Sequence, residues 1–292
     1  MPEHFAAPPN WEWWILLYFF FAGIAGGSYA IGTLIRIFGT TADQRAARIA
    51  FIVAFVALIF CPIFLIVDLG SPLRFTHMVL NDSEGGLMFK SWSPMSLGSW
   101  GLLLFGVFAF VSFLGAVAET GVTWLDPVSR ILRGTVGAVW DAIGTVFALF
   151  IAGYTGVLLA VSNQNVWSDA GWVLGGMFLA SGLTGAGALL LGLVGTRGAA
   201  DSGTTLRLED ADRNFALVET ILIVVFLVFL GVAGTLAKIL GIWLLLWAVV
   251  ALGVIASLFL ARVRGLPLLT SPVLTLLGVL ALRAVVIFAA QY

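Results

Sequence analysis

Eight long apolar runs dominate this 292-residue sequence and restrict it to one class of fold. Each run holds about 20 or more mostly apolar residues, the length that an α-helix needs to cross a hydrocarbon core of ~30 Å. Lipid offers the backbone no hydrogen bonds, and the runs lack the alternation of β-barrel strands, so helices are predicted. The expected spans are roughly 13–38, 47–69, 96–118, 132–160, 171–195, 214–237, 239–261 and 268–289.

The composition supports the same class. Hydrophobic residues make up 61% of the chain and charged residues only 10%, whereas soluble domains carry about 25% charged residues. The formal net charge of −1 argues against nucleic acid as a partner. We therefore predict an all-α integral membrane protein with one transmembrane domain over residues 1–292.

Basic residues are unevenly distributed between the connectors of this eight-span arrangement. With the N-terminus outside, ten fall on the cytoplasmic side, namely Arg36, Arg45, Arg48, Arg130, Arg133, Arg197, Arg207, Arg213, Arg262 and Arg264. Four fall on the outer side, namely Arg74, Lys90, Lys238 and Arg283. The positive-inside rule then places both termini outside the cytoplasm.

An ionisable cluster follows the second apolar run. Gly70 and Pro72 are predicted to stop that helix, which leaves Asp68, Arg74 and His77 together at the outer interface. Charged groups at membrane depth are costly and are therefore candidates for function. The alternative is that Asp68 only pairs with Arg74.

Two tyrosines are expected at a similar depth. Tyr154 lies near the outer end of the fourth run, and Tyr18 lies about one turn into the first. A phenol in an apolar pocket can donate a hydrogen bond to a carbonyl oxygen. Gly153 and Gly156, which flank Tyr154, are expected to let its flat ring approach the backbone. The alternative is an interfacial anchor in the aromatic belt.

Acidic residues also occur within the cytoplasmic half of the predicted helices. Asp141 lies about 14 Å inside the fourth span and Glu219 about 8 Å inside the sixth. Asp212 and Glu219 are seven residues apart and share a helix face. Together with Arg283, these residues are candidates for a proton route. The alternative is structural, either interhelical hydrogen bonding or pairing with an arginine, namely Arg133, Arg213 or Arg283.

Glycine-rich segments recur in the first and fifth runs, at 23–27 and 182–187. Each is followed by an Ala-Asp sequence with a nearby arginine, and both helices are predicted to run from outside to inside. A parallel duplication explains this similarity. Small-residue faces that recur in any helix bundle explain it as well.

The sequence holds few metal ligands. His4 and His77 are its two histidines and Cys61 is its one cysteine, so a bis-histidine haem or a cysteine-ligated cluster is not expected. Neither a P-loop nor a dinucleotide-binding fingerprint is present. An electron-carrying protein of this kind would take its redox centres from another subunit.

Four ordered motifs resemble the polysulfide reductase membrane subunit family, the NrfD/PsrC-like proteins. They are Trp11-x-Trp13-Trp14 with Gly23-Ile-Ala-Gly26-Gly27, Asp68-Leu-Gly-x-Pro72-x-Arg74-Phe-x-His77, Ser93-Pro-Met-Ser96-x-Gly98-Ser-Trp100, and Tyr154-Thr-Gly156-Val-Leu-Leu.

The resemblance implies eight helices in two four-helix bundles and a site for menaquinone or ubiquinone at the outer face. Helices one, two and four would form this site, with Asp68 and Tyr154 as its principal residues. A family asparagine and histidine correspond to Ile15 and Tyr18 here, so the quinone and the reaction direction stay open.

The implied setting is the cytoplasmic membrane of a bacterium or archaeon. The implied partners are a four-cluster iron–sulfur subunit and a molybdopterin catalytic subunit. A multihaem cytochrome, as in alternative complex III, is the second possibility. A secondary transporter lined by Asp141, Glu219 and Arg283 is the competing hypothesis, which predicts a chain that functions without partners.

Overall fold

The computed structural model describes residues 9–80, 86–196, 198, 202–263 and 265–292. His4, Arg197 and Arg264 lie outside these residues. Apart from one antiparallel bridge between Leu80 and Leu87, the regular structure of the described chain is helical. Seven helices are long and apolar enough to cross a membrane, which makes the chain a multi-pass membrane protein. They are α1 (Trp13–Phe38), α2 (Gln44–Asp68), α3 (Pro94–Ala118), α5 (Gly134–Ala160), α7 (Val173–Thr196), α8 (Ser202–Ala233) and α11 (Thr270–Ala289).

The seventh predicted span differs most from the structure. Hydropathy predicts a continuous helix over 239–261, but the chain forms α9 (Leu236–Leu240), a break, and then α10 (Leu244–Leu258). Gly234, with a φ of 80°, ends the preceding helix α8, and Gly241 ends α9. The 15 residues of α10 extend for about 22 Å, less than the thickness of the hydrocarbon core.

Helix α8 begins twelve residues before the predicted start at residue 214, inside a segment expected to be a connector. The polar residues of this extension are held by partners at the same end of the bundle. Arg207 pairs with Asp43 at 2.6 Å, and Asp210 pairs with Arg262. Hydropathy detects only the apolar part of a helix, which explains why the predicted start lies after the observed start of α8.

The other predicted spans agree with the structure to within a few residues. Short helices occupy the connectors: η1 (Thr41–Asp43), η2 (Pro72–Met78), η3 (Thr123–Leu125), α4 (Asp126–Ile131), α6 (Asn165–Ala170) and η4 (Leu260–Arg262). As predicted, α2 ends at Asp68, Gly70 has a φ of 64°, and Pro72 begins η2.

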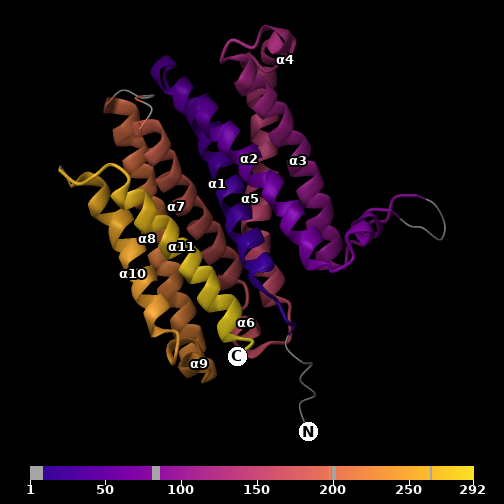
Figure 1. Ribbon diagram of the computed structural model, residues 1–292, viewed down its shortest axis with the longest axis vertical. Coiled ribbons are helices and arrows are strands. Elements are labelled where there is room, and N and C mark those ends of the chain that lie inside the picture. Colours follow the sequence, from indigo (N-terminus) through magenta and orange to yellow (C-terminus); the bar gives the residue numbers. More distant parts are fainter. Residues whose placement is uncertain (1–8, 81–85, 197, 199–201, 264) are drawn as a thin grey trace.

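The long helices run side by side along the molecule (Figure 1). Helices α1, α2, α3 and α5 pack in one ring of four, and α7, α8, α10 and α11 pack in a second. Contacts of α7 with α1 and α5, and of α11 with α1, join the two rings. The glycine-rich segments meet at this junction, where a Cβ on Gly27 would lie 2.6 Å from the carbonyl oxygen of Gly182. Small residues therefore bring α1 and α7 together, a contact that either explanation of the repeat accommodates.

The two ends of the described chain lie together (Figure 1). The amide of Trp11 donates to Oε1 of Gln291 at 2.7 Å, and Nε2 of Gln291 donates to the carbonyl of Trp11 at 3.1 Å. The Trp11 ring stacks on Trp167, whose Nε1 donates to the carbonyl of Val286 at 2.6 Å. These contacts fix the start of α1 against the end of α11.

Candidate functional site

A cavity of about 590 Å³ lies among α1, α2, α3, α5 and η2. Most of its wall is apolar. Its polar side chains include Tyr18 of α1, Asp68 of α2, Ser99 of α3 and Tyr154 of α5. The structure thus brings three of the five predicted outer-face residues to one cavity, from three different helices.

Tyr154 is 7% exposed, and its hydroxyl donates to the carbonyl oxygen of Pro94 at 2.7 Å. Its ring stacks on Phe150 and lies against Gly98 of α3, where a Cβ would overlap the phenol. The tyrosine is therefore clamped between α5 and the start of α3. Because the hydroxyl proton is directed at Pro94, the oxygen lone pairs remain to accept a hydrogen bond.

The glycines that flank Tyr154 have a different role from the predicted one. A Cβ on Gly156 would overlap the backbone of Leu174, and a Cβ on Gly153 would lie 3.5 Å from the carbonyl oxygen of Gly175. Gly156 therefore allows α5 to pack closely on α7, whereas a methyl group at Gly153 would make only an ordinary van der Waals contact with α7. Gly98, on a different helix, makes room for the ring.

Asp68 is the last residue of α2 and is partly buried. Within the described chain, no ion pair joins it to Arg74 and no side chain donates a hydrogen bond to it, so the predicted alternative of simple pairing lacks support. Glu12 at the start of α1 is near enough to repel it. Asp68 thus presents a carboxylate at the cavity wall without a fixed cation.

Arg74 and His77 lie on η2 and are exposed. Neither lines the cavity, although their neighbours Phe75 and Met78 do. The segment therefore covers the cavity with apolar side chains and directs these two basic side chains elsewhere.

Ile15 and Tyr18 are the helix-one residues that the resemblance aligns with a polar pair. Both side chains line the cavity, and Tyr18 is 3% exposed. Tyr18 therefore offers a hydroxyl at this wall, whereas Ile15 contributes only apolar surface.

Helix α3 forms a wall of the cavity that was not predicted from the sequence. Its lining residues run from Met95 to Phe110, about 22 Å along the helix. Across the cavity, the lining residues of α2 extend from Phe55 to Leu69. The polar groups cluster at the end of the cavity where α2 meets η2, and the rest of the cavity is apolar.

A proline interrupts the hydrogen bonding of the α2 wall. Pro62 lies inside the helix and, having no N–H, leaves the carbonyl of Leu58 without its usual partner. Both residues line the cavity.

The Ser93-Pro-Met-Ser96-x-Gly98 motif was the sequence signal for α3, but a motif alone does not show which wall of a cavity a helix forms.

Asp141 belongs to a different cluster. It is fully buried, accepts from Oγ of Ser112 at 2.9 Å, and pairs with Nη1 of Arg36 at 3.4 Å. Tyr29 donates to the same carboxylate at 3.5 Å, and Arg36 also pairs with Glu119 at 3.5 Å. The predicted alternative of interhelical bonding fits, but the cation is Arg36 rather than Arg133, Arg213 or Arg283.

Glu219 and Arg283 lie near each other in the second ring. Arg283 is fully buried, and its Nη1 donates to Oγ of Ser181 at 2.7 Å. The carboxylate of Glu219 lies near Ser181, Thr184 and Arg283. Ser181 is therefore close to both charged groups.

Asp212 is 1% exposed, and neither carboxylate oxygen has a hydrogen-bond partner in the described chain. The hydroxyl of the nearby Ser257 is instead hydrogen-bonded to Thr275 at 2.9 Å. A Cβ on Gly187 would lie 2.9 Å from Oδ1 of Asp212. A buried acid without partners is costly, which marks Asp212 as unusual.

No group of three or more histidine, cysteine, aspartate or glutamate side chains in the described residues is placed to hold a metal ion. A segment of 83 residues is 30% identical to a selenate reductase subunit of Mesobacillus selenatarsenatis, covering 28% of this chain and 19% of that protein. Residues 2–292 match the family model described as polysulphide reductase, NrfD. The family match spans nearly the whole sequence, and the chain therefore belongs to the NrfD polysulphide reductase family.

Proposed function

We propose that this chain is the membrane anchor and quinone-binding subunit of a multisubunit oxidoreductase, with its quinone site in the cavity lined by Tyr18, Asp68 and Tyr154. The observation that carries the proposal is the convergence of these three side chains on one end of an otherwise apolar cavity. An isoprenoid quinone has the same division, because its ring carries two oxygens and its tail is hydrocarbon. The length of the α2 and α3 walls accommodates both parts.

The chemistry is the exchange of two electrons and two protons between quinone and quinol. The Tyr154 oxygen, which already donates to Pro94, accepts a hydrogen bond from a quinol hydroxyl. The Asp68 carboxylate takes or returns a proton at the outer end of the cavity, and the Tyr18 hydroxyl donates to the second ring oxygen. General acid–base groups of this kind contribute about 10²–10⁴ in rate.

The electrons require a partner. The proposed partner is a four-cluster iron–sulfur subunit linked to a molybdopterin enzyme, in keeping with the reductase to which part of the chain is similar. The alternative is a multihaem cytochrome, as in an alternative complex III assembly.

The proposed topology has α10 as an eighth span in a bacterial or archaeal cytoplasmic membrane. The contact between Trp11 and Gln291 supports termini on one side, which requires an even number of crossings. Arg36, Arg48 and Arg207 lie at the other end, which is then cytoplasmic by the positive-inside rule.

The decisive experiment compares Asp68→Asn and Tyr154→Phe with wild type in the purified complex. Each variant is expected to lower quinone-coupled turnover by about 10²-fold or more. Partner activity with an artificial electron donor or acceptor should be unchanged. Asp169→Asn is the matched control, because Asp169 lies on α6, where it accepts from Thr235 and does not line the cavity.

Wild-type turnover and quinone affinity in both variants would refute the assignment. Co-purification tests the broader proposal. A redox partner isolated with the chain supports an electron-transfer role, whereas a chain that transports a solute alone favours the secondary transporter.

A second proposed role is a proton route through the other ring, supported by the unpartnered carboxylate of Asp212. Glu219 lies two turns further along α8, about 10 Å away, and the nearby Arg283 donates to the carbonyl of Phe19 at 3.3 Å. Phe19 follows Tyr18 in the sequence, and Tyr18 lines the cavity. These groups join the Asp212 end of α8 to the proposed quinone site, whereas Asp141 is enclosed by its own partners.

Proteoliposomes with an enclosed pH dye test this route. Asp212→Asn and Glu219→Gln should reduce proton movement per quinone turned over, while the exposed neighbour Asp210→Asn should not. Proton movement at the wild-type level in all three variants would exclude the route.

A further inference from the structure

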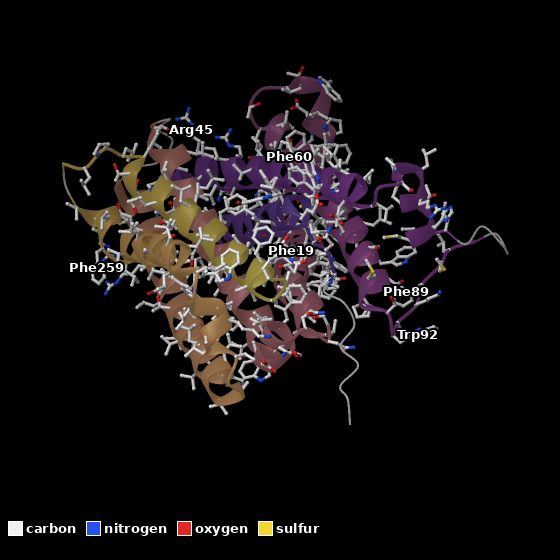
Figure 2. All side chains as sticks on the ribbon, turned by 60° about the horizontal axis from the view of Figure 1, so that its bottom comes forward. Phe19, Arg45, Phe60, Phe89, Trp92 and Phe259 are labelled. Atoms are coloured by element: carbon white, nitrogen blue, oxygen red, sulfur yellow. The ribbon has the colours of Figure 1, made fainter. Side chains whose placement is uncertain are left out.

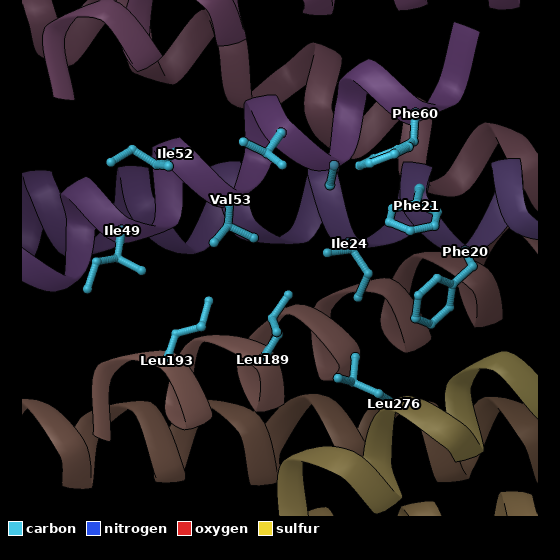
Figure 3. A pocket seen from close by; sticks show the side chains of 12 residues that line it. Phe20, Phe21, Ile24, Ile49, Ile52, Val53, Phe60, Leu189, Leu193 and Leu276 are labelled. Atoms are coloured by element: carbon cyan, nitrogen blue, oxygen red, sulfur yellow. The ribbon is translucent and has the colours of Figure 1, made fainter. Parts of the chain in front are cut away.

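An apolar groove on the outside of the helix bundle lies away from the proposed quinone site. It has a volume of about 390 Å³ and is formed by α1, α2, α7 and α11. Figure 3 shows Ile49 and Leu193 at one end and Phe20, Phe21 and Phe60 at the other. All twelve side chains that line it are apolar.

The groove has the length of one membrane leaflet. Its α2 wall extends from Ile49 to Phe60, about 16 Å along the helix, and half of a hydrocarbon core is about 15 Å. Its floor includes Ile24 and Ala57, and Val56 and Phe60 at the rim are 46% and 38% exposed. The groove therefore opens sideways, where a hydrocarbon chain can enter from the membrane.

A cation stands at one end of the groove. Arg45 precedes Ile49 by four residues on α2, so it lies on the same helix face one turn nearer the end of the helix. Arg45 is exposed (Figure 2) and has no ion pair in the described chain. By contrast, the arginines at 36, 48, 207 and 262 all pair with carboxylates.

We propose that this groove is a binding site for one anionic phospholipid, with an acyl chain between α2 and α7 and its phosphate at Arg45. The site lies in the leaflet at the Arg45 end of the bundle, whereas the polar end of the quinone cavity lies at the opposite end of α2. The lipid fills the gap between the two rings of helices. It thereby supports the α1–α7 contact from the membrane side.

Lipid retention by the purified chain tests the proposal, with phosphatidylglycerol as the probe and phosphatidylcholine as the zwitterionic comparison. After delipidation and re-addition, wild type should retain about one phosphatidylglycerol per chain and less phosphatidylcholine. Arg45→Gln should weaken phosphatidylglycerol binding about fivefold, as for one arginine near a lipid surface. Arg130→Gln is the matched control, because Arg130 lies on α4, away from the groove, and has no ion pair among the described residues.

Two groove-filling variants test the acyl-chain part. Val53→Trp in the groove and Val56→Trp at its rim should each abolish retention. Val139→Trp places the same bulk on the exposed face of α5 and should not. Helicity and the thermal midpoint in detergent identify any variant that fails to fold. Val56 at the rim is 46% exposed, so Val56→Trp is expected to fold even if Val53→Trp does not.

Retention unchanged in Val56→Trp, or displacement of the bound lipid by a short-chain quinone analogue, would overturn the site. Equal retention of phosphatidylglycerol and phosphatidylcholine would overturn the role of Arg45. Failure of the quinone experiment would affect neither result, because the groove and the cavity share no lining residue.

Discussion

Gly98 of α3 lies against the phenol ring of Tyr154 of α5, so closely that a Cβ atom on residue 98 would overlap the ring. The hydroxyl of the same tyrosine donates to Pro94, four residues earlier on α3. One turn of α3 therefore fixes both the plane of the ring and the direction of its hydroxyl. This relationship makes the start of α3 a positioning element of the proposed quinone site.

The first prediction is that Gly98→Ala displaces the Tyr154 ring and breaks its hydrogen bond to Pro94. Overpacking of this kind costs about 1–3 kcal/mol in the free energy of unfolding. Quinone-coupled turnover should fall with it. Both quantities are measured on the same detergent-purified complex, by denaturation and by quinone kinetics.

Gly106→Ala is the matched control, because Gly106 lines the same cavity on the same helix and a Cβ there would meet nothing within 4 Å. Alanine in a helix interior is favoured over glycine by about 1 kcal/mol, so this variant should be at least as stable as wild type. A similar loss in both variants would show that helix α3 tolerates no added methyl group and that the Tyr154 contact is not specific.

The second prediction concerns Asp141, which is held by Ser112, Tyr29 and Arg36. Asp141→Asn should lower the free energy of unfolding by about 3 kcal/mol, because it leaves Arg36 with a broken pair in a largely buried setting. Quinone affinity should not change. Chemical denaturation in detergent measures the first quantity and a binding titration the second.

Asp126→Asn at the start of the short helix α4 serves as the comparison and should change stability by less than about 0.5 kcal/mol. A stable Asp141→Asn protein with impaired quinone binding would contradict the separation of the two clusters.

The fold and much of the candidate site can be predicted from the sequence because both depend on depth along helices. Asp68 and Tyr154 fall near the C-terminal ends of the second and fourth apolar runs, and depth along these runs alone places them at one end of the molecule. The direction in which a residue faces around its helix axis is not given by its depth. This orientation places Gly98 rather than Gly153 against the Tyr154 ring, and it places Asp141 next to Arg36. A single sequence does not determine these rotations.

Two helix boundaries are hidden from hydropathy for a similar reason. The polar start of α8 is held by an ion pair between Arg207 and Asp43 of η1. This contact joins residues far apart in the sequence and has no hydropathy signal. The break between α9 and α10 follows from backbone geometry at Gly241, and glycines also occur inside α1 and α7 without breaking those helices.

The third prediction contrasts two buried acids. Asp43 accepts from Arg207 at 2.6 Å and 2.8 Å and from the amide of Thr40 at 2.6 Å, so Asp43→Asn should cost about 2 kcal/mol. Asp212 has no such partners in the described chain. Asp212→Asn should therefore leave stability within about 0.5 kcal/mol of wild type or raise it. Parallel denaturation curves decide, and a large loss in Asp212→Asn would reveal a structural role.

The last prediction addresses the junction of the two rings. The guanidinium of Arg283 donates to the carbonyls of Phe19 on α1 and Phe178 on α7, at 3.3 Å and 3.1 Å, and to Ser181. A planar fork with five donors suits these scattered acceptors, whereas a lysine ammonium presents its donors at one point. Arg283→Lys should therefore lose about 3 kcal/mol in spite of its retained charge.

Removing the charge tests the coupling between Arg283 and Glu219. Arg283→Gln leaves the buried carboxylate without its cation and should be as destabilising as the lysine variant. Adding Glu219→Gln should recover part of that loss, because the double variant buries no uncompensated charge. The measurement is the free energy of unfolding of the two single variants and the double variant in detergent. Strictly additive losses would show that the two groups do not interact, and the proton route drawn through them would then lose its central link.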